Sequence, residues 1–345
     1  VTVQPEPVGA NDLATAICSD TQTGYTLAVA GATTYTISTN SNGLVQSNGS
    51  ISAGSGKLAA ELFDDQWTNT TLADVNVIYT ITPVTGSCSG NSFTVTIPIR
   101  PEPLGVNDVR TICSNSSVNY DLQVTNIDGP GNDMASNFVW VAADNPNVSG
   151  ESLTNQTTGT ISNTLVNVTS VNQVVVYTVT PTGTVSGCQG NVFTVTVTVQ
   201  PEPVGVANTA TVCSDVAPGA GVTLATTGTS VSAATYTIAV NSNSLTQSSG
   251  TNSVGAGKAA NELIDDAWTN TTGGNVNVIY TVTPISSSGC AGTPFTVTVT
   301  VQPEPVGAND LATAICSDTQ TGYTLAVAGA TTYTISTNSN GLVQS

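Results

Sequence analysis

Residues 193–200 read FTVTVTVQ, and residues 295–302 repeat the same eight letters. A third version, FTVTIPIR, occupies residues 93–100. In each version apolar residues alternate with polar ones, as in a strand that buries one face. Val, Ile and Thr also favour strands over helices. The three segments therefore predict an all-β protein in which every repeat closes on the same half-buried strand.

A Pro-Glu-Pro motif follows each closing strand and divides the chain into repeats. It begins at Pro5, Pro101, Pro201 and Pro303, in steps of 96, 100 and 102 residues. Each step holds about seven short strand-like runs separated by Gly, Asn and Ser clusters, which is typical of an immunoglobulin-like β-sandwich. We expect repeat 1 at residues 5–100, repeat 2 at 101–200 and repeat 3 at 201–302.

A longer period is superimposed on these steps, because residues 1–47 recur unchanged as residues 299–345. We interpret residues 303–345 as an incomplete copy of repeat 1, and residues 1–4 as the last strand of a preceding repeat. The chain is then a window on an array of three-domain cassettes. Proline restricts its own backbone and that of the preceding residue, so the short linkers predict an elongated array of tandem domains.

One segment departs from the β pattern. It reads KLAAELFDDQW at residues 57–67 and KAANELIDDAW at residues 258–268. Lys, Ala, Glu and Leu are strong helix formers. We expect one short helical turn at each of these places, in repeats 1 and 3 only.

The seven cysteines fall into two sets. The early set follows Ile or Val and precedes Ser, and comprises Cys18, Cys113, Cys213 and Cys316. The late set lies in the Gly- and Ser-rich loop before the closing strand, and comprises Cys88, Cys188 and Cys290. Pairing within repeats would give Cys18–Cys88, Cys113–Cys188 and Cys213–Cys290, with Cys316 pairing beyond the window.

The alternative pairing joins each late cysteine to the next early one across the linker, as in Cys88–Cys113. Roughly 40 Å of extended strand separates Cys88 from Pro101. The chain then enters the next domain moving away, whereas a disulfide needs Cα atoms within about 7 Å. We expect the within-repeat pairing, and disulfides of this kind imply an oxidising, extracellular or cell-surface location.

Composition excludes several classes of function. Four basic residues against 22 acidic ones give a net charge of -18, the wrong sign for binding nucleic acid. No apolar stretch approaches the length of a membrane span. Histidine is absent, so the usual catalytic bases are missing, and no Cys-x-x-Cys pair suggests a zinc site. Residues 51–59, ISAGSGKLA, resemble a phosphate loop only faintly, because Leu58 replaces the required Ser or Thr. We expect no enzyme activity, cofactor or metal.

Acidic pairs leave a calcium alternative open. The adjacent acids are Asp64 and Asp65, repeated as Asp265 and Asp266. Without a dense Asp-x-Asp-x-Asp spacing, solvated loop acids are the favoured interpretation. Glu6 with Asp12 and Glu102 with Asp108 flank the linkers and would suit an ion between domains, although the third copy has Asn208 instead.

Two further motifs have both a structural and a binding interpretation. Trp67 and Trp268 share the motif Asp-Asp-x-Trp-Thr-Asn-Thr-Thr, and Trp140 lies in a strand. An exposed Trp stacks on sugars, but one Trp per domain usually belongs to the core. Asn69 and Asn270 begin glycosylation sequons, which also arise by chance in a chain this rich in Asn and Thr.

The ordered motifs resemble those of a known family. They are Thr-[Ile/Val]-Cys-Ser, Thr-Asn-Thr-Thr, Val-x-Val-x-Tyr-Thr-Val-Thr-Pro, Gly-Cys-x-Gly-x-x-Phe-Thr-Val-Thr-Val and Pro-x-Pro. This series resembles the PKD-like repeats, which are immunoglobulin-like modules of very large secreted and cell-surface proteins of gliding-type Gram-negative bacteria. The resemblance covers nearly the whole chain and implies export by the type IX route and a role in stalks or adhesins. Residues 161–169 follow the family pattern in repeat 2, whereas repeats 1 and 3 carry the Lys-to-Trp segment.

These observations favour a structural or adhesive stalk or filament segment of a very long extracellular protein. Its principal partners would be neighbouring repeats of the same chain. The alternative is an adhesin module that binds a surface glycan repeatedly for avidity, which requires an exposed Trp beside a groove. Self-assembly into filaments is a further hypothesis. FTVTVTV at a sheet edge would pair with another chain, and Pro98 would blunt that edge in repeat 1.

Overall fold

The computed structural model describes residues 3–344 and divides into two compact units. The first unit is Val1–Val168 with Gln173–Val199, and the second is Thr169–Asn172 with Gln200–Ser345. Each repeat has its own cluster of buried hydrophobic side chains. The prediction for residues 1–4 falls partly outside the described residues, and Val3 and Gln4 are exposed and outside any strand.

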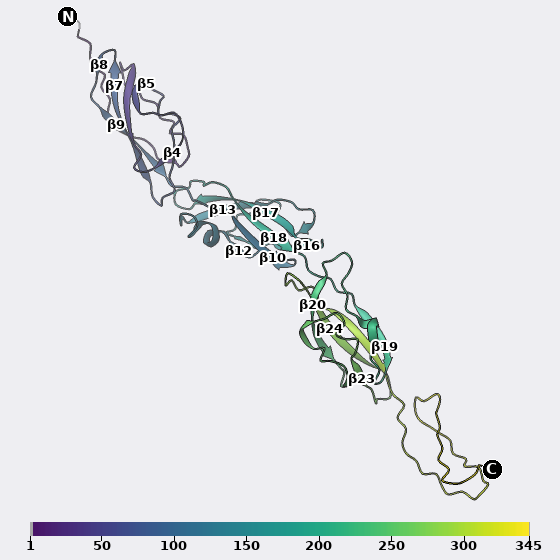
Figure 1. Ribbon diagram of the computed structural model, residues 1–345. Helices are drawn as coiled ribbons and strands as arrows, with labels where there is room; N and C mark the ends of the chain where they lie inside the picture. Colours follow the sequence, from purple (N-terminus) through teal and green to yellow (C-terminus); the bar gives the residue numbers. More distant parts are fainter. Residues whose placement is uncertain (1–2, 345) are drawn as a thin grey trace. The chain divides into compact units, whose positions relative to one another are not determined.

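Repeat 1 is built from two sheets. Its strands are β1 (Asp12–Leu13), β2 (Ile17–Cys18), β3 (Thr34–Asn40), β4 (Val45–Asn48), β5 (Gly54–Lys57), β6 (Gln66–Thr68), β7 (Val75–Thr85), β8 (Cys88–Ser89) and β9 (Phe93–Arg100). The larger sheet has the order β1-β9-β7-β3-β5, with β2 on β9 and β8 on β7, and β4 pairs with β6. Figure 1 shows β7 and β9 side by side. Leu62, Trp67, Tyr79 and Val95 belong to its core.

Repeat 2 follows the same plan with more small strands. They are β10 (Asp108–Cys113), β11 (Ser116–Ser117), β12 (Tyr120–Asp121), β13 (Ser136–Ala142), β14 (Val148–Ser149), β15 (Thr160–Ile161), β16 (Thr164–Asn167), β17 (Gln173–Gly183) and β18 (Phe193–Gln200), with a π-helix η1 (Gln123–Ile127). The sheets have the orders β10-β18-β17-β13, β11-β16-β14 and β12-β15. Trp140, Tyr177 and Val195 lie in its core.

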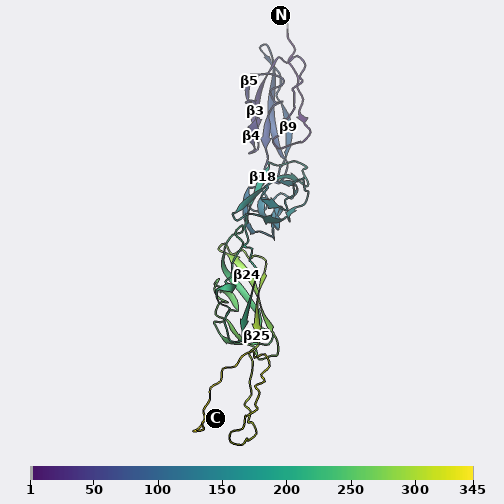
Figure 2. The ribbon, with the colours of Figure 1, turned by 90° about the vertical axis from the view of Figure 1, so that its right-hand side faces the viewer.

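Repeat 3 resembles repeat 1. Its elements are β19 (Asn208–Cys213), the 3-10 helix η2 (Gly219–Val222), β20 (Ala233–Asn241), β21 (Thr246–Ser249), β22 (Gly255–Lys258), β23 (Ala267–Thr269), β24 (Val276–Ser286) and β25 (Phe295–Gln302). The sheets have the orders β19-β25-β24-β20-β22 and β21-β23. Figure 2 shows β24 and β25, which pair antiparallel. Tandem immunoglobulin-like sandwiches are thus the fold of this chain, as the alternating strands predict.

Each closing strand lies inside its sheet. β9 is flanked by β1 and β2 on one side and by β7 on the other, and β18 and β25 are flanked in the same way. The first strands of repeats 1 and 3 run parallel to the closing strand. The condition for pairing with another chain, FTVTVTV at a free sheet edge, is therefore not met, because both edges of each closing strand are already paired.

Pro98 has a different effect from the one expected. In repeat 3 the first strand pairs continuously with the closing strand, from Asn208 opposite Val297 to Cys213 opposite Gln302. In repeat 1 the first strand is split into β1 and β2, and the pairing offset changes by one residue between them. Pro98 stands opposite this break and has no N–H to give to the ladder. The proline therefore interrupts an interior pairing.

The expected helical turns are chains of tight turns. After β5, three successive backbone bonds connect residues three apart: Glu61 N to Leu58 O, Phe63 N to Ala60 O and Asp65 N to Leu62 O. The equivalent bonds in repeat 3 are longer, at 3.4 Å each. No helix forms in either segment, and the helices of the described residues lie at η1 and η2 instead.

Residues 303–344 show how much the fold depends on long-range pairing. They have the sequence of the start of repeat 1 but form no strand. Tyr35 and Ile37 in β3 are 3% and 2% exposed, whereas the identical Tyr333 and Ile335 are 42% and 70% exposed. β3 pairs with β5 and β7, and the residues equivalent to those strands come later in a repeat. In residues 303–344 these partner strands are missing, so the copy of β3 has no strand to pair with and stays exposed.

Candidate functional site

The candidate site is the place where repeat 1 meets repeat 2. On the repeat 1 side, Cys18 ends β2 directly opposite Arg100, the last residue of β9. Parallel pairing therefore brings the early cysteine to the end of the repeat where the linker begins. The linker residues Pro101, Glu102 and Pro103 are all buried. They are part of a packed junction and not an exposed tether.

On the repeat 2 side, two glycines allow the loop that carries Cys188 to pack closely against the linker. A Cβ atom on Gly190 would overlap the carbonyl oxygen of Pro103, and one on Gly105 would overlap the ring of Phe193. Only glycine allows such close approach. The motifs Pro-x-Pro-x-Gly and Cys-x-Gly-x-x-Phe therefore pack against each other, and Cys188 lies beside the start of its own repeat.

A disulfide joins these two positions. Cys18 is bonded to Cys188, with 5.4 Å between their Cα atoms and 170 residues between them in the sequence. Cys188 is 1% exposed. Closing a loop of this length removes roughly 5 kcal/mol of unfolded-state entropy in the simple polymer model. The bond connects consecutive repeats covalently at their contact.

The within-repeat pairing is wrong at all three predicted pairs. Cys88 and Cys213 are free thiols, and Cys188 is already bonded to Cys18. The pairs Cys18–Cys88, Cys113–Cys188 and Cys213–Cys290 are therefore excluded. Within repeat 1, Cys18 lies at the end of β9 and Cys88 before its start, so a strand of eight residues, roughly 26 Å long, separates them.

Two other cysteines are also oxidised. Cys113 and Cys290, the equivalents of Cys18 and Cys188 one repeat further along, are both disulfide-bonded. The linker alternative is excluded as well, because it needs Cys88 as a partner and Cys88 is free. Cys316 is an exposed free thiol.

Asn69 organises the polar side of the junction. Its side-chain amide donates to the carbonyls of Ile99 and Ala73, at 2.7 and 3.0 Å. Its backbone N–H donates to Ser19 Oγ, and its carbonyl accepts the N–H of Glu102. The motifs Cys-Ser, Thr-Asn-Thr-Thr and Pro-Glu-Pro therefore meet at one residue.

The same contacts exclude glycosylation at this sequon. Asn69 and its equivalent Asn270 are both 0% exposed. Asn270 Nδ2 donates to Val301 O and Gly274 O in the same way. A glycan attached to either nitrogen would displace these bonds from the interior.

Asn132 connects the second repeat to the first. Its Nδ2 donates to the carbonyls of Thr70 and Glu102, at 2.8 and 2.9 Å, and its Oδ1 accepts the N–H of Leu104. A small cavity of about 340 Å³ lies next to these contacts, lined by Leu72, Ala73, Asp74, Arg100, Pro101, Met134, Val185 and Ser186. Repeats 1 and 2 thus share hydrogen bonds as well as a disulfide.

Glu102 carries the most perturbed carboxyl of the junction. Burial, the charge of Asp20 and a hydrogen bond with Asp20 raise the pKa of Glu102 to about 7. Burial would raise the pKa of Asp20, but hydrogen bonds from Ser47, Thr68 and Glu102 lower it. Asp108, which with Glu102 would suit an ion between domains, instead accepts a hydrogen bond from the hydroxyl of Tyr120 at 2.6 Å. Asp12 accepts a hydrogen bond from the hydroxyl of Tyr25 in the same way.

The second acid of each Asp-Asp pair is a core residue. Asp65 and Asp266 are 0% and 2% exposed, so the interpretation as solvated loop acids is wrong for them. Asp65 accepts hydrogen bonds from Ser52 Oγ, Tyr79 OH and Gln46 Nε2, at 2.7, 2.7 and 2.9 Å. Trp67 Nε1 donates to Tyr79 OH at 2.9 Å. Repeat 3 has the same network around Asp266.

All three tryptophans are buried. Trp67 and Trp268 are each 6% exposed, and Trp140 is 3% exposed. In repeat 2 the indole N–H of Trp140 donates to Thr158 O, and its ring meets Tyr177 edge to face at 5.7 Å. The interpretation of one core Trp per domain is therefore confirmed, and the exposed Trp that the glycan-binding alternative requires is absent among the described residues.

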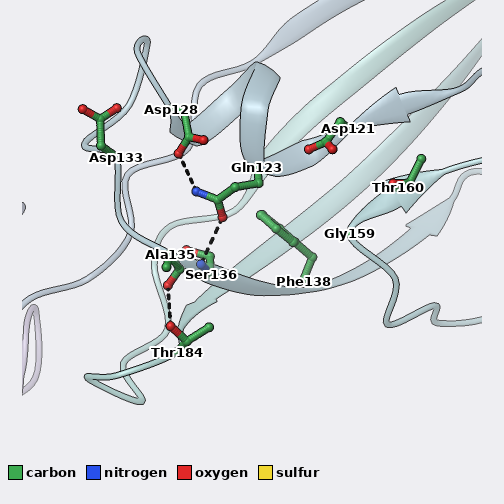
Figure 3. A pocket seen from close by; sticks show the side chains of 10 residues that line it. All are labelled: Asp121, Gln123, Asp128, Asp133, Ala135, Ser136, Phe138, Gly159, Thr160 and Thr184. Atoms are coloured by element: carbon green, nitrogen blue, oxygen red, sulfur yellow. Dashed lines mark hydrogen bonds between the residues drawn. The ribbon is translucent and has the colours of Figure 1, made fainter.

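An acidic pocket in repeat 2 is the other candidate. It has a volume of about 430 Å³ and is lined by Asp121, Gln123, Asp128, Asp133, Ala135, Ser136, Phe138, Gly159, Thr160 and Thr184. Figure 3 shows Gln123 between Asp128 and Ser136; it donates to Asp128 Oδ1 and accepts the N–H of Ser136. Asp121 accepts the N–H of Val124, and Asp133 that of Gly129. These polar groups hold the turns around η1.

Residues 3–344 contain no group of three or more His, Cys, Asp and Glu side chains placed to hold a metal ion. Within the same range no helix is long and apolar enough to cross a membrane.

The three repeats of the chain match a known family of domains. Residues 15–103, 110–203 and 210–305 each match the PKD-like domain, and together they span most of the chain. This chain belongs to the PKD-like domain family. Each of the three matched segments contains one early and one late cysteine.

Several solved structures are similar to this PKD-like chain. Drosophila N-cadherin EC1-4 has 10% sequence identity and a TM-score of 0.25, covering 86% of this chain and 74% of that chain. The human desmocollin-1 ectodomain has 13% identity and a TM-score of 0.26, covering 88% and 62%. Chicken CNTN1 FN1-FN3 has 11% identity and a TM-score of 0.25, covering 79% and 89%. No curated protein matches the sequence.

Neither the within-repeat pairing nor the linker pairing takes account of the direction of the first strand, which decides the disulfide between PKD-like repeats. The signal lies in the strand directions. The early cysteine ends a strand that runs parallel to the closing strand, so it must lie at the linker. The late cysteine precedes the closing strand of the next repeat, so it lies at that repeat's linker end. The parallel pairing therefore places the early cysteine of one repeat beside the late cysteine of the next.

Proposed function

We propose that this run of PKD-like domains is a structural stalk segment of an extracellular protein, in which disulfides connect consecutive repeats. The observation that carries the proposal is the bond between Cys18 in repeat 1 and Cys188 in repeat 2. A bond within one domain would stabilise only that domain. A bond across a junction fixes one domain to the next and carries load in parallel with the linker.

The repeat pattern supports a general rule. In each repeat the early cysteine would bond to the late cysteine of the following repeat. The oxidised state of Cys113 and Cys290 agrees with that rule. Disulfides used in this way require an oxidising compartment, which supports an extracellular or cell-surface location. The family resemblance extends the proposal to export by the type IX route in gliding-type bacteria.

A glycan-binding adhesin is the weaker candidate. Its main support was a Trp available for stacking on sugars, and the three tryptophans are buried in the cores of their repeats. The role that we propose is structural and non-catalytic, with neighbouring repeats as the main partners.

Single-molecule stretching tests the proposal. The full chain is held at both ends in a C113S/C290S background, which leaves Cys18–Cys188 as the cross-link to be measured. Under oxidising conditions the 170 residues between these cysteines are shielded from the force. At about 3.5 Å per residue, reduction should add roughly 600 Å to the unfolded length. Equal lengths before and after reduction would contradict the proposal, and a C18S variant serves as the control that is insensitive to reductant.

A further inference from the structure

We infer that the cavity between repeats 1 and 2 is a binding site for a free α-amino acid with an apolar side chain. This site goes beyond the structural role proposed above, because a junction that carries load needs no ligand. The cavity has a volume of about 340 Å³. That volume is at the small end of the range of ligand pockets, which is about 300 to 1,000 Å³.

Two opposite charges, Asp74 and Arg100, line the cavity. Val75 begins β7 and pairs with Ile99 of β9, so Asp74 before it and Arg100 after Ile99 lie at the same end of two neighbouring strands. An α-amino acid carries its ammonium and its carboxylate on one carbon atom, so it needs two opposite charges close together. A guanidinium binds a carboxylate through two parallel hydrogen bonds, and a carboxylate accepts hydrogen bonds from an ammonium group.

Both charges are available to a ligand. The side chains of Asp74 and Arg100 are exposed. In residues 3–344 both lysines, Lys57 and Lys258, are paired with glutamates, whereas Asp74 and Arg100 have no ion-pair partner within 4 Å. In this acidic chain Arg100 is therefore a cation that a carboxylate ligand reaches without displacing a carboxylate of the protein.

The apolar wall of the cavity comes from both repeats. Leu72 of repeat 1 is 63% exposed and Val185 of repeat 2 is 94% exposed, whereas Met134, which lines the same cavity, is buried. Covering exposed apolar surface is favourable. An apolar side chain of the ligand covers Leu72 and Val185 together, so the ligand is shared by the two domains.

The other repeats lack these side chains. At the equivalent positions both charges are replaced by neutral amides and the leucine is replaced by a small residue. The replacements are Ser170, Asn172 and Gln200 in repeat 2, and Gly273, Asn275 and Gln302 in repeat 3. The late-cysteine loop of repeat 3 reads Ser-Ser-Ser-Gly at residues 286–289, without a large apolar residue like Val185. The Pro-Glu-Pro linker motif recurs after every repeat, so the charges and the apolar wall are additions to a common junction.

A direct ion pair between Asp74 and Arg100 is the rival explanation, because opposite charges on neighbouring strands attract each other. It explains why both charges are replaced together in the other repeats. It does not explain why exposed Leu72 and Val185 line the same cavity. Binding experiments separate the two explanations, since charges that satisfy each other have nothing to offer an amino acid.

Met134 makes the test direct, because it lines the cavity and is the one methionine of the chain. The full chain, with its disulfides intact and its methionine methyl group isotope-labelled, is titrated with L-leucine and followed by NMR. The methyl resonance should shift and then saturate. Leucinamide lacks the carboxylate and isocaproate lacks the ammonium group, so each should need a concentration about tenfold higher or more for half-saturation.

Two variants test the charges separately. Arg100→Gln and Asp74→Asn introduce the residue types that repeats 2 and 3 carry at these positions, so both variants should fold. Each should raise the leucine concentration at half-saturation by about tenfold or more. Arg110→Gln is the matched control and should bind leucine like the native sequence, because Arg110 is also exposed and without an ion pair among the described residues but does not line the cavity.

Four results would overturn the inference. They are a Met134 resonance that leucine does not move, equal half-saturation by leucine, leucinamide and isocaproate, unchanged leucine binding in Arg100→Gln or Asp74→Asn, and equal weakening in Arg110→Gln. The first is also the result that a direct ion pair predicts. None of these measurements depends on the role of the Cys18–Cys188 bond under load, so the proposed function is tested separately.

Discussion

The carboxylate of Asp65 lies 2.7 Å from the hydroxyl of Tyr79, inside the core of repeat 1. Burial is the main cause that raises the pKa of both groups, and their hydrogen bond stabilises the arrangement. Tyr177 occupies the equivalent position in repeat 2, but its hydroxyl has no hydrogen-bond partner among the described residues. The same tyrosine is therefore held by a polar network in one repeat and by apolar packing in another.

Replacing these tyrosines by phenylalanine should have opposite consequences. Tyr79→Phe removes one of the three hydrogen bonds that Asp65 accepts and leaves the indole N–H of Trp67 without its partner, so repeat 1 should lose about 1 to 3 kcal/mol of unfolding free energy. Tyr177→Phe removes an unpartnered hydroxyl, so repeat 2 should change by less than about 0.5 kcal/mol or become more stable. Denaturant unfolding measures both effects, with Trp67 or Trp140 kept as the single fluorophore.

Tyr280→Phe in repeat 3 is the matched positive control, because Tyr280 donates to Asp266 at 2.8 Å. It should behave like Tyr79→Phe. Equal losses in all three repeats would show that the hydroxyl of Tyr177 is in fact satisfied and that the contrast is wrong.

Local patterns were enough to predict the fold. Alternation of apolar residues with Thr located the closing strands, and the spacing of Pro-Glu-Pro located the repeats. They could not predict which strands are neighbours, because a period of two says which face is buried and nothing about the partner strand. For this reason the interior place of FTVTVTV and the split of the first strand at Pro98 came only from the structure.

The candidate site was harder to predict. The cysteines, and the motifs that meet at Asn69, can be seen in the sequence because they recur in every repeat. Their partners cannot be seen in the same way, since the disulfide joins residues 170 positions apart. The burial of Asp65 and Asn69 is hidden in the sequence for a related reason. Asp and Asn in a polar segment are usually solvated, and only the network of partners around them makes burial possible.

Glu102 should make repeat 1 sensitive to pH. Its pKa is raised from 4.5 to about 7 in the folded protein, so the folded state keeps a proton that the unfolded chain releases. The contribution to stability is fully present below about pH 4.5 and is lost as the pH rises through about 7. Glu102→Gln removes this titration. The unfolding free energy of the variant minus that of the native sequence should therefore be about 1 to 3 kcal/mol larger at pH 8 than at pH 4.5.

Denaturant unfolding of both proteins at the two pH values, followed by Trp67 fluorescence in a W140F/W268F background, measures this difference. Glu6→Gln is the control, because Glu6 stands in the same Pro-Glu-Pro motif but is exposed. A pH dependence that is identical in the native sequence and in Glu102→Gln would refute the role of Glu102.

Gly105 should tolerate no side chain. A Cβ there would overlap the ring of Phe193, so Gly105→Ala should destabilise repeat 2 by about 1 to 3 kcal/mol, as overpacking does. Gly159→Ala is the control, because a Cβ at that position meets no atom within 4 Å. Thermal or denaturant unfolding followed by Trp140 measures both. Equal effects of the two substitutions would mean that the start of repeat 2 is not held against its closing strand.

The connection of repeats through Cys18 and Cys188 can be tested most directly by digestion with trypsin. The chain has four basic residues, and Arg100 precedes proline, where trypsin does not cleave. Denatured, unreduced monomer of the C113S/C290S variant, with its thiols alkylated, should therefore give fragments 1–57, 58–110, 111–258 and 259–345. The expected result is fragment 1–57 joined to 111–258, with 58–110 alone and alkylated at Cys88. Fragment 1–57 joined to 58–110 would show pairing within repeat 1 and contradict the covalent junction.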